Sequence, residues 1–430
     1  MASSDAIESD GADIPTGVKG LFRALRHRNF QLFFIGQLIS LTGTWMQVVA
    51  QSWLVYRLTG SAILLGVVGF AGNIPSFVFA PFAGVLADRW NRHRLLVITQ
   101  ILSMIQALIF AALILTDVIA VWHIIVLSCF LGLINAFDMP IRQSFISDML
   151  ERKDDLSNAI ALNSTMVNGS RLAGPSIAGI LIALVGEGYC FLINGLSFIA
   201  VIAALLAMKG YRKQSKGRRE PIWQGLREGF SYVFGFPPLR SVILLLALTS
   251  LIGMPYVILM PIFARNILGG GPNTLGFLMA ATGVGALVAA ICLASRRNVR
   301  GLGKMVGLSA AIFGLGLIMF SFSRSFPVSV ALMAVTGFGM IVQMAGSNTV
   351  LQTIAEEDKR GRVMSFYTMA FRGMVPFGSL LAGSVAAAIG APNTLLAGGI
   401  CCVLAAGLYM RSLPSLRRLC PAEEVFGRSS

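Results

Sequence analysis

The chain is short of charge and of histidine, and its cysteines follow no pattern. Only 12% of its 430 residues are charged, whereas 56% are hydrophobic. Soluble domains carry about 25% charged residues. The three histidines are scattered, and the six cysteines show neither CxxC nor Cys/His metal spacing. The sequence also lacks a GxxxxGK[ST] loop and a catalytic-triad layout. We therefore predict no metal, no cofactor, no enzymatic activity and no ATP-driven pumping.

The sequence is dominated by long apolar runs. Such runs recur along the whole chain, and each is long enough to cross a bilayer as a helix. We predict an all-α membrane protein with twelve transmembrane helices, whose approximate bounds are 30–56, 61–87, 94–115, 121–142, 157–185, 189–208, 241–264, 273–294, 303–322, 327–350, 361–389 and 393–411.

The basic residues indicate the orientation of these helices. If both termini are cytoplasmic, 29 of the 34 Lys and Arg lie in cytoplasmic segments or at their edges. We therefore expect a multi-pass protein of the bacterial cytoplasmic (inner) membrane. The net charge of +15 is spread over short segments, which favours anionic lipid at the cytoplasmic face over nucleic acid as a partner.

The chain divides into two similar halves. Segments 143–179 and 348–383 share a polar turn and then a helix bearing Arg-x-x-x-Pro, with Arg171 and Arg372 separated by 201 residues. Two pseudo-symmetric six-helix bundles are typical of a secondary transporter with its small-molecule site near the midplane. The predicted organisation is a disordered cytoplasmic tail (1–18), an N-terminal bundle (19–208), a cytoplasmic linker with an amphipathic helix (209–240), a C-terminal bundle (241–412) and a cytoplasmic tail (413–430).

A short charged loop separates the second and third predicted helices. It contains Gly84, Asp88, Arg89, Arg92 and Arg94. An acid at the end of one helix can meet the positive N-terminal end of another, and the arginines can pair with acids or lipid phosphates. One hypothesis is a latch that holds the two bundles together at the cytoplasmic face. The alternative is a basic anchor that only fixes orientation.

This loop resembles the conserved loop motif of the major facilitator superfamily. The stretches "LRHRNFQLFFIGQLISLTGTWMQVVAQSWLVYRLTGSA", "MPIRQSFISDML" and "NAIALNSTMVNGSRLAGPSIAG" resemble the branch that contains the enterobactin exporter and related drug and macrolide efflux proteins. The resemblance covers about 20–412 and implies twelve helices, alternating access and export that is usually proton-driven. It also implies that the latch meets the helix beginning near Arg360–Arg362.

The stretch "GPSIAG" resembles the antiporter signature of this superfamily. It contains Gly174, Pro175 and Gly179. The resemblance implies a seal on one side of the substrate cavity, because glycines allow helices to approach closely and proline bends a helix. The alternative is ordinary packing of small residues.

Asp138 and Arg142 lie four residues apart on one face of the fourth predicted helix. A carboxylate inside a membrane is costly and usually paired. Asp138 is therefore either the proton-coupling acid or a structural partner of Arg142 or of the loop arginines, with Arg142 as part of the latch. The first predicted helix contains only glutamines, Gln37, Gln47 and Gln51, which leaves the driving ion open.

Arg171 and Arg372 are expected deep inside their helices. Such a cation costs about 2.5–3.5 kcal/mol to insert, so each must face a cavity, an acid or free carbonyls. The functional hypothesis is a clamp for an anionic or polyphenolic substrate. The alternatives are carbonyls freed by Pro175 and Pro376, or an ion pair between Arg171 and Asp138. The further substrate-binding candidates are Gln47, Gln51, Asn73, Asn168, Gln343 and Tyr256, with Asn135, Asn163, Trp45 and Trp53 as other cavity-lining candidates.

The sequence therefore favours a proton-coupled exporter of amphipathic, siderophore- or drug-like molecules that acts as a monomer. A lysophospholipid or lipid flippase of the same fold is one alternative. A membrane scaffold or sensor without transport is another, although such a protein has no reason to retain arginines in its interior.

Overall fold

A computed structural model describes residues 23–89, 91–150, 153–209, 222–296, 299–419 and 425; for 80–89, 153, 222–226 and 417–419 it describes the backbone only. Most of these residues are helical, and there is no strand among them. The first half contains η1 (Arg23–Arg26), α2 (Arg28–Thr59), α3 (Ala62–Arg89), α4 (Arg92–Leu115), α5 (Val121–Asp148), η2 (Lys153–Asp155), α6 (Leu156–Val185) and α7 (Glu187–Ala207). The second half contains α8 (Ile222–Gly235), α9 (Pro237–Leu248), η3 (Thr249–Gly253), α10 (Tyr256–Ile262), η4 (Phe263–Ile267), α11 (Pro272–Ala294), α12 (Leu302–Phe322), α13 (Phe326–Ile354), α14 (Arg360–Thr368), η5 (Met369–Gly373), α15 (Val375–Ile389) and α16 (Ala391–Leu419).

The twelve predicted transmembrane helices are confirmed. Within the described part of the chain, twelve helices are long and apolar enough to cross a membrane. Several extend beyond the predicted ends: α5 continues to Asp148 and α16 to Leu419. The apolar pattern ends where a helix leaves the hydrocarbon, whereas the backbone hydrogen bonds continue through the polar turns beyond it.

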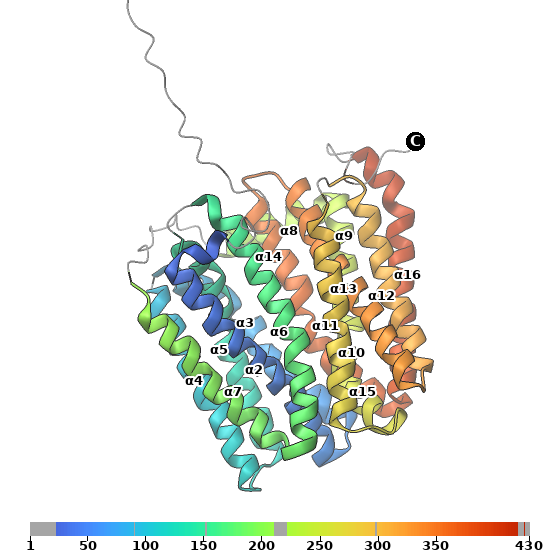
Figure 1. Ribbon diagram of the computed structural model, residues 1–430. Coiled ribbons are helices and arrows are strands. Elements are labelled where there is room, and N and C mark those ends of the chain that lie inside the picture. Colours follow the sequence, from blue (N-terminus) through green and yellow to red (C-terminus); the bar gives the residue numbers. More distant parts are fainter. Residues whose placement is uncertain are drawn as a thin grey trace, which may run out of the picture.

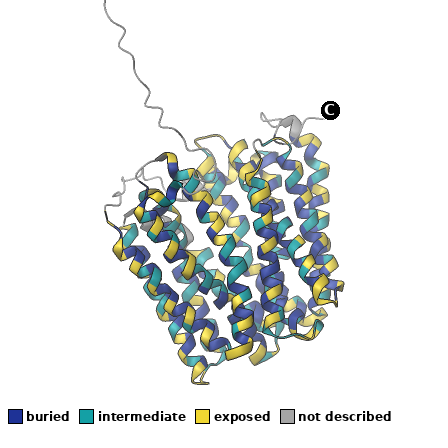
Figure 2. Ribbon diagram, viewed as in Figure 1, coloured by how far each residue is buried: buried dark blue, intermediate teal, exposed yellow. Residues whose placement is uncertain are grey.

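The helices form two bundles that stand side by side, α2–α7 and α9–α16 (Figure 1). α6 packs against α11 and α3 against α15, so these four helices make the main contact between the bundles. We call the end where α2 begins and α8 lies the basic end, and the opposite end, where α2 stops and α11 begins, the far end. Many large apolar side chains are exposed, among them Leu184, Leu206 and Leu408. Exposed residues run along the outward sides of the helices (Figure 2). Such a surface is suited to lipid.

The two bundles share an apolar core only toward the far end. One continuous cluster of buried side chains there includes Val49, Ala178, Leu275 and Ala382, which come from both bundles. At the basic end each bundle has a separate cluster, one drawn from residues before 209 and one from residues after 232. The bundles are therefore joined at the far end and packed independently at the basic end.

Glycine pairs allow the close contact at the far end. A Cβ on Gly179 would lie 3.1 Å from the Cα of Gly276, and a Cβ on Gly66 would lie 3.0 Å from the Cα of Gly383. Such crossings leave no room for a side chain. The side-chain amide of Asn266 also donates to the hydroxyl of Tyr56 across the bundles, at 2.7 Å.

Two membrane-spanning helices are interrupted by π-helical turns that prolines explain. A proline cannot donate a backbone hydrogen bond, and its ring crowds the carbonyl four residues earlier. For Pro255 that carbonyl belongs to Leu251 in η3, and for Pro376 it belongs to Arg372 in η5. Such turns are frequent at functional sites, and η5 sets the backbone from which the Arg372 side chain leaves.

Replacing Gly276 by leucine should separate the bundles at the far end, because the side chain would collide with the backbone of α6. Gly407→Leu is the matched control, since a Cβ at Gly407 meets nothing within 4 Å. Spin labels on Asp117 and Ser325, in exposed far-end loops of the two bundles, report the separation. We expect Gly276→Leu to shift the measured distance upward and Gly407→Leu to leave it unchanged. Equal distances in both variants would contradict the close crossing.

Candidate functional site

Arg171 leaves α6 at the interface between the bundles. Its guanidinium lies over the ring of Trp45 in α2, 5.3 Å from the ring centroid, within the range of a cation–π contact. Its Nη2 atom lies 3.8 Å from the Sδ atom of Met340, which belongs to α13 of the opposite bundle. The side chain is partly exposed. Arg171 therefore contacts both bundles.

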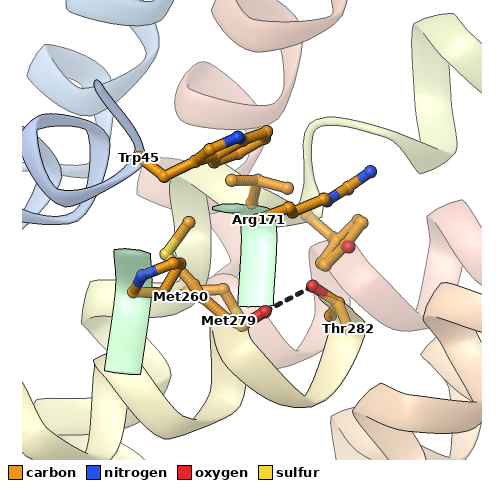
Figure 3. A pocket seen from close by; sticks show the side chains of 8 residues that line it. Trp45, Arg171, Met260, Met279 and Thr282 are labelled. Atoms are coloured by element: carbon orange, nitrogen blue, oxygen red, sulfur yellow. Dashed lines mark hydrogen bonds between the residues drawn. The ribbon is translucent and has the colours of Figure 1, made fainter. Parts of the chain in front are cut away.

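A small cavity of about 20 Å³ adjoins Arg171 (Figure 3). It has room for roughly one water molecule. Tyr256 is only 1% exposed there, and its buried hydroxyl lies close to Arg171 and Thr282 without a well-aligned hydrogen bond to either. The hydroxyl of Thr282 instead donates to the carbonyl of Met279, at 2.6 Å. The lining residues are Trp45, Arg171, Pro175, Tyr256, Val257, Met260, Met279 and Thr282.

Arg372 occupies the equivalent position in the second bundle. It is exposed although it lies in the middle of a membrane-spanning helix. Its Nη1 atom donates to the sulfur of Met139 in α5, again in the opposite bundle. Arg142 is close enough to repel it electrostatically. Among the described residues, neither Arg171 nor Arg372 forms an ion pair with a carboxylate.

Asp138 is part of a polar network within the N-terminal bundle. It is 3% exposed and accepts from Arg142 at 2.8 Å, from Thr99 at 2.8 Å and from Gln100 at 2.7 Å. Arg142 also donates to the side-chain oxygen of Gln37, at 3.0 Å. This is the geometry of a buried ion pair with its remaining acceptors satisfied. These contacts are those expected if Asp138 is a structural partner of Arg142. Its proton-coupling role stays a prediction.

The uncharged candidates separate into two groups. Gln47, Gln51 and Gln343 bond to other helices of their own bundle, with Gln47 bonded to Gln106 and Asn194, Gln51 to Ser128, and Gln343 to Thr249. Asn73 is exposed and Asn168 is half-buried, and each donates only to a carbonyl four residues earlier on its own helix. The first group holds helices together, whereas the amides of the second group bond only within their own helices, and Tyr256 lines the cavity.

Only part of the charged loop is described. The side chains of Gly84, Asp88 and Arg89 lie outside the described residues, and so does the predicted contact of Asp88 with the start of α14. Arg92 pairs with Asp148 of α5, at 3.2 Å between Nη1 and Oδ2. Arg94 is exposed, and its backbone N–H donates to the side-chain oxygen of Asn91, the capping residue just before α4.

The residues of the "GPSIAG" stretch contact both bundles. A Cβ on Gly174 would lie 2.7 Å from the carbonyl oxygen of Thr42, so α6 packs tightly on α2. Pro175 lies inside α6 and lines the Arg171 cavity. Gly179 makes the far-end crossing with Gly276. The helices therefore pack closely on one side of Arg171, and the sealing role of this stretch stays a prediction.

Sequence reasoning overlooked the methionines of the interface. Met139 and Met340 contact the two arginines, while Met260 and Met279 line the cavity. Methionine is common in apolar runs, and its presence there is no signal in itself. The signal that could have found them lies in the internal repeat, because Met139 and Met340 are separated by the same 201 residues as Arg171 and Arg372.

Across the described residues, twelve membrane-spanning helices form two bundles, and two arginines at their interface have no carboxylate partner; this is the architecture of a major facilitator transporter. The family model described as "Transmembrane secretion effector" matches residues 19–423, and the chain belongs to this family of the major facilitator superfamily.

Known proteins of similar sequence are transporters. The chain is 26% identical to the "Staphyloferrin A transporter" of Staphylococcus aureus (strain NCTC 8325 / PS 47), over 86% of this chain and 92% of that protein. It is 27% identical to the "Multidrug efflux pump Tap" of Mycolicibacterium fortuitum, over 90% of this chain and 96% of that one. Both alignments span nearly the full length of the relative.

Solved structures show the same fold. A bacterial homologue of the human lysosomal transporter Spinster, in an inward-facing and occupied conformation, superposes with a TM-score of 0.71, 13% identity, and coverage of 91% of this chain and 97% of that chain. The POT family transporter PepTSo gives a TM-score of 0.71, 14% identity, and coverage of 91% and 99%. At such identities the likeness concerns the fold alone.

Asp138→Asn should destabilise the protein, because it leaves Arg142 without its carboxylate inside the bundle. Removing one member of a buried ion pair typically costs about 3–5 kcal/mol. We expect a lower unfolding temperature in detergent, and partial recovery in the double variant Asp138→Asn/Arg142→Gln. If Asp138→Asn unfolds at the wild-type temperature but no longer transports, the structural interpretation is wrong and the proton-coupling interpretation gains support.

Proposed function

We propose that this protein exports amphipathic, siderophore- or drug-like molecules across the bacterial cytoplasmic membrane by alternating access. The observation that carries the proposal is the pair of arginines at the interface, each without an acidic partner among the described residues. A guanidinium in a membrane interior persists only where an aqueous cavity, an acceptor or a substrate compensates it. The names of the similar proteins, a siderophore transporter and a multidrug efflux pump, support this class of substrate.

The proposed orientation places the basic end in the cytoplasm, following the distribution of Lys and Arg. The bundles are joined at the far end by the glycine crossings and packed separately at the basic end. Nearer the basic end, Asn168 is only half-buried and a Cβ on Gly169 would meet nothing within 4 Å. This geometry suits a state that receives substrate from the cytoplasm and must open the far end to release it.

Exposed basic residues at the same end are the proposed contacts for anionic lipid. Arg94 and Arg240 are both exposed there, and neither has an ion-pair partner among the described residues. Basic side chains near an anionic leaflet contribute about 1 kcal/mol each to its attraction. We propose that the transporter works as a monomer, because one chain supplies both bundles and the whole interface between them.

Arg171→Gln and Arg372→Gln should each lower transport about tenfold or more, since a hydrogen bond to a charged group contributes about 1.5–3 kcal/mol. The measurement is the uptake of a fluorescent amphipathic dye into everted vesicles that contain equal amounts of each variant. Arg411→Gln, which changes an exposed arginine of α16 away from the interface, is the control and should transport normally. Wild-type rates in both interface variants, at normal expression, would end the proposal for the arginines.

The proposed energy source is the proton gradient. Collapsing it with a protonophore should raise dye accumulation in cells that express the protein to the level of cells that lack it. Sodium-free medium is the matched control and should leave export intact. Export that survives the protonophore but stops without sodium would contradict proton coupling and leave the exporter function standing.

A further inference from the structure

Each interface arginine contacts a methionine sulfur of the opposite bundle, and the two contacts are related by the internal repeat. Arg171 of α6 contacts Met340 of α13, and Arg372 of η5 contacts Met139 of α5. Both the arginines and the methionines are separated by 201 residues. Two equivalent contacts in the two halves of a repeat indicate a shared role.

A thioether is a poor partner for a guanidinium. Its sulfur is a weak acceptor, whereas the guanidinium has five N–H donors arranged to bind carboxylate oxygens in pairs. Arg171 also lies beside the buried hydroxyl of Tyr256, which has no well-aligned hydrogen-bond partner. An oxygen acceptor reaching this point would satisfy the guanidinium and the hydroxyl together.

The surroundings of the two arginines favour an anion. Arg142 repels Arg372 from across the interface, and the charge of Arg142 is already engaged by Asp138. A negative charge placed near Arg372 would relieve this repulsion. Around Arg171, the ring of Trp45 and the side chains of Met260 and Met279 provide an apolar, polarizable wall that suits an aromatic group.

We propose that Met139 and Met340 are substitute ligands, which hold the arginines in the empty transporter and are displaced by a carboxylate or phenolate oxygen of an aromatic, anionic substrate. This inference rests on the proposed function and specifies its substrate class. Both arginine–methionine contacts join the two bundles. A substrate that replaces the sulfurs removes two contacts between the bundles. Its affinity is therefore different for a conformation in which the arginine–methionine contacts form and for one in which they do not. Such a difference is what a ligand needs to shift a conformational equilibrium.

The test compares a carboxylate with its amide. Anthracene-9-carboxylate and anthracene-9-carboxamide are fluorescent and similar in shape, and only the first is charged at neutral pH. Binding of each to the purified full-length protein is measured by fluorescence anisotropy. The wild type should bind the carboxylate more tightly than the amide, and Arg171→Gln should abolish this preference.

Variants at Met340 separate displacement of the sulfur from simple packing. Gln has a similar length and a strong acceptor oxygen, so Met340→Gln should compete for Arg171 and weaken carboxylate binding about two- to tenfold. Met340→Leu removes the acceptor and should bind the carboxylate at least as tightly as the wild type. Neither change should alter amide binding. Met139→Gln tests the same competition at Arg372 and serves as the second variant if Met340→Gln folds poorly.

A third arginine–methionine contact provides the control. Arg296 donates to the sulfur of Met305, at 2.8 Å, within the C-terminal bundle at the basic end. Met305→Gln should leave both affinities unchanged. Equal carboxylate affinities in the Gln and Leu variants of Met340, or no preference for the carboxylate in the wild type, would overturn the inference.

Transport separates this inference from the proposed function. If proteoliposomes export both probes equally and Met340→Gln has no effect, the protein is an exporter in which no anion displaces the methionine sulfur. If the binding pattern appears but neither probe nor other amphipathic molecules are transported, the anion site stands and the exporter function falls.

Discussion

A cation inside a membrane-spanning helix has to find an acceptor, and the central part of this protein is organised by that constraint. Arg142 meets it with Asp138 and Gln37, inside one bundle. Arg171 and Arg372 do not, because their acceptors are methionine sulfurs of the opposite bundle. The first arrangement is complete and belongs to the framework. The second leaves strong donors with weak partners at the surface where the bundles meet, which is where a substrate has to pass.

The rest of the interface gives these arginines their setting. Glycine crossings bring the bundles together at the far end, while each bundle has its own apolar cluster at the basic end. Pro376 and the π turn before it determine where Arg372 leaves its helix. Each of these features is local, and together they place two cations at a junction that is closed on one side.

Much of the fold could be predicted from the sequence. Hydropathy located all twelve helices, and the spacing of Arg171 and Arg372 revealed the repeat. The helix ends and the π turns could not be predicted, because they depend on hydrogen bonds beyond the apolar stretches and on strain at prolines. The sequence also could not show toward which neighbouring helix each glutamine side chain points. Gln343 faces Thr249 within its own bundle, because helix rotation is set by packing against neighbours and not by composition. The roles of Met139 and Met340 could not be predicted because methionine is common in apolar runs and does not stand out there.

The most direct measurement of the central claim is an experimental structure with anthracene-9-carboxylate bound. The account predicts its carboxylate within hydrogen-bond distance of the Arg171 guanidinium and the Tyr256 hydroxyl, with the sulfur of Met340 moved away. A ligand bound elsewhere, with Arg171 still against Met340, would contradict it.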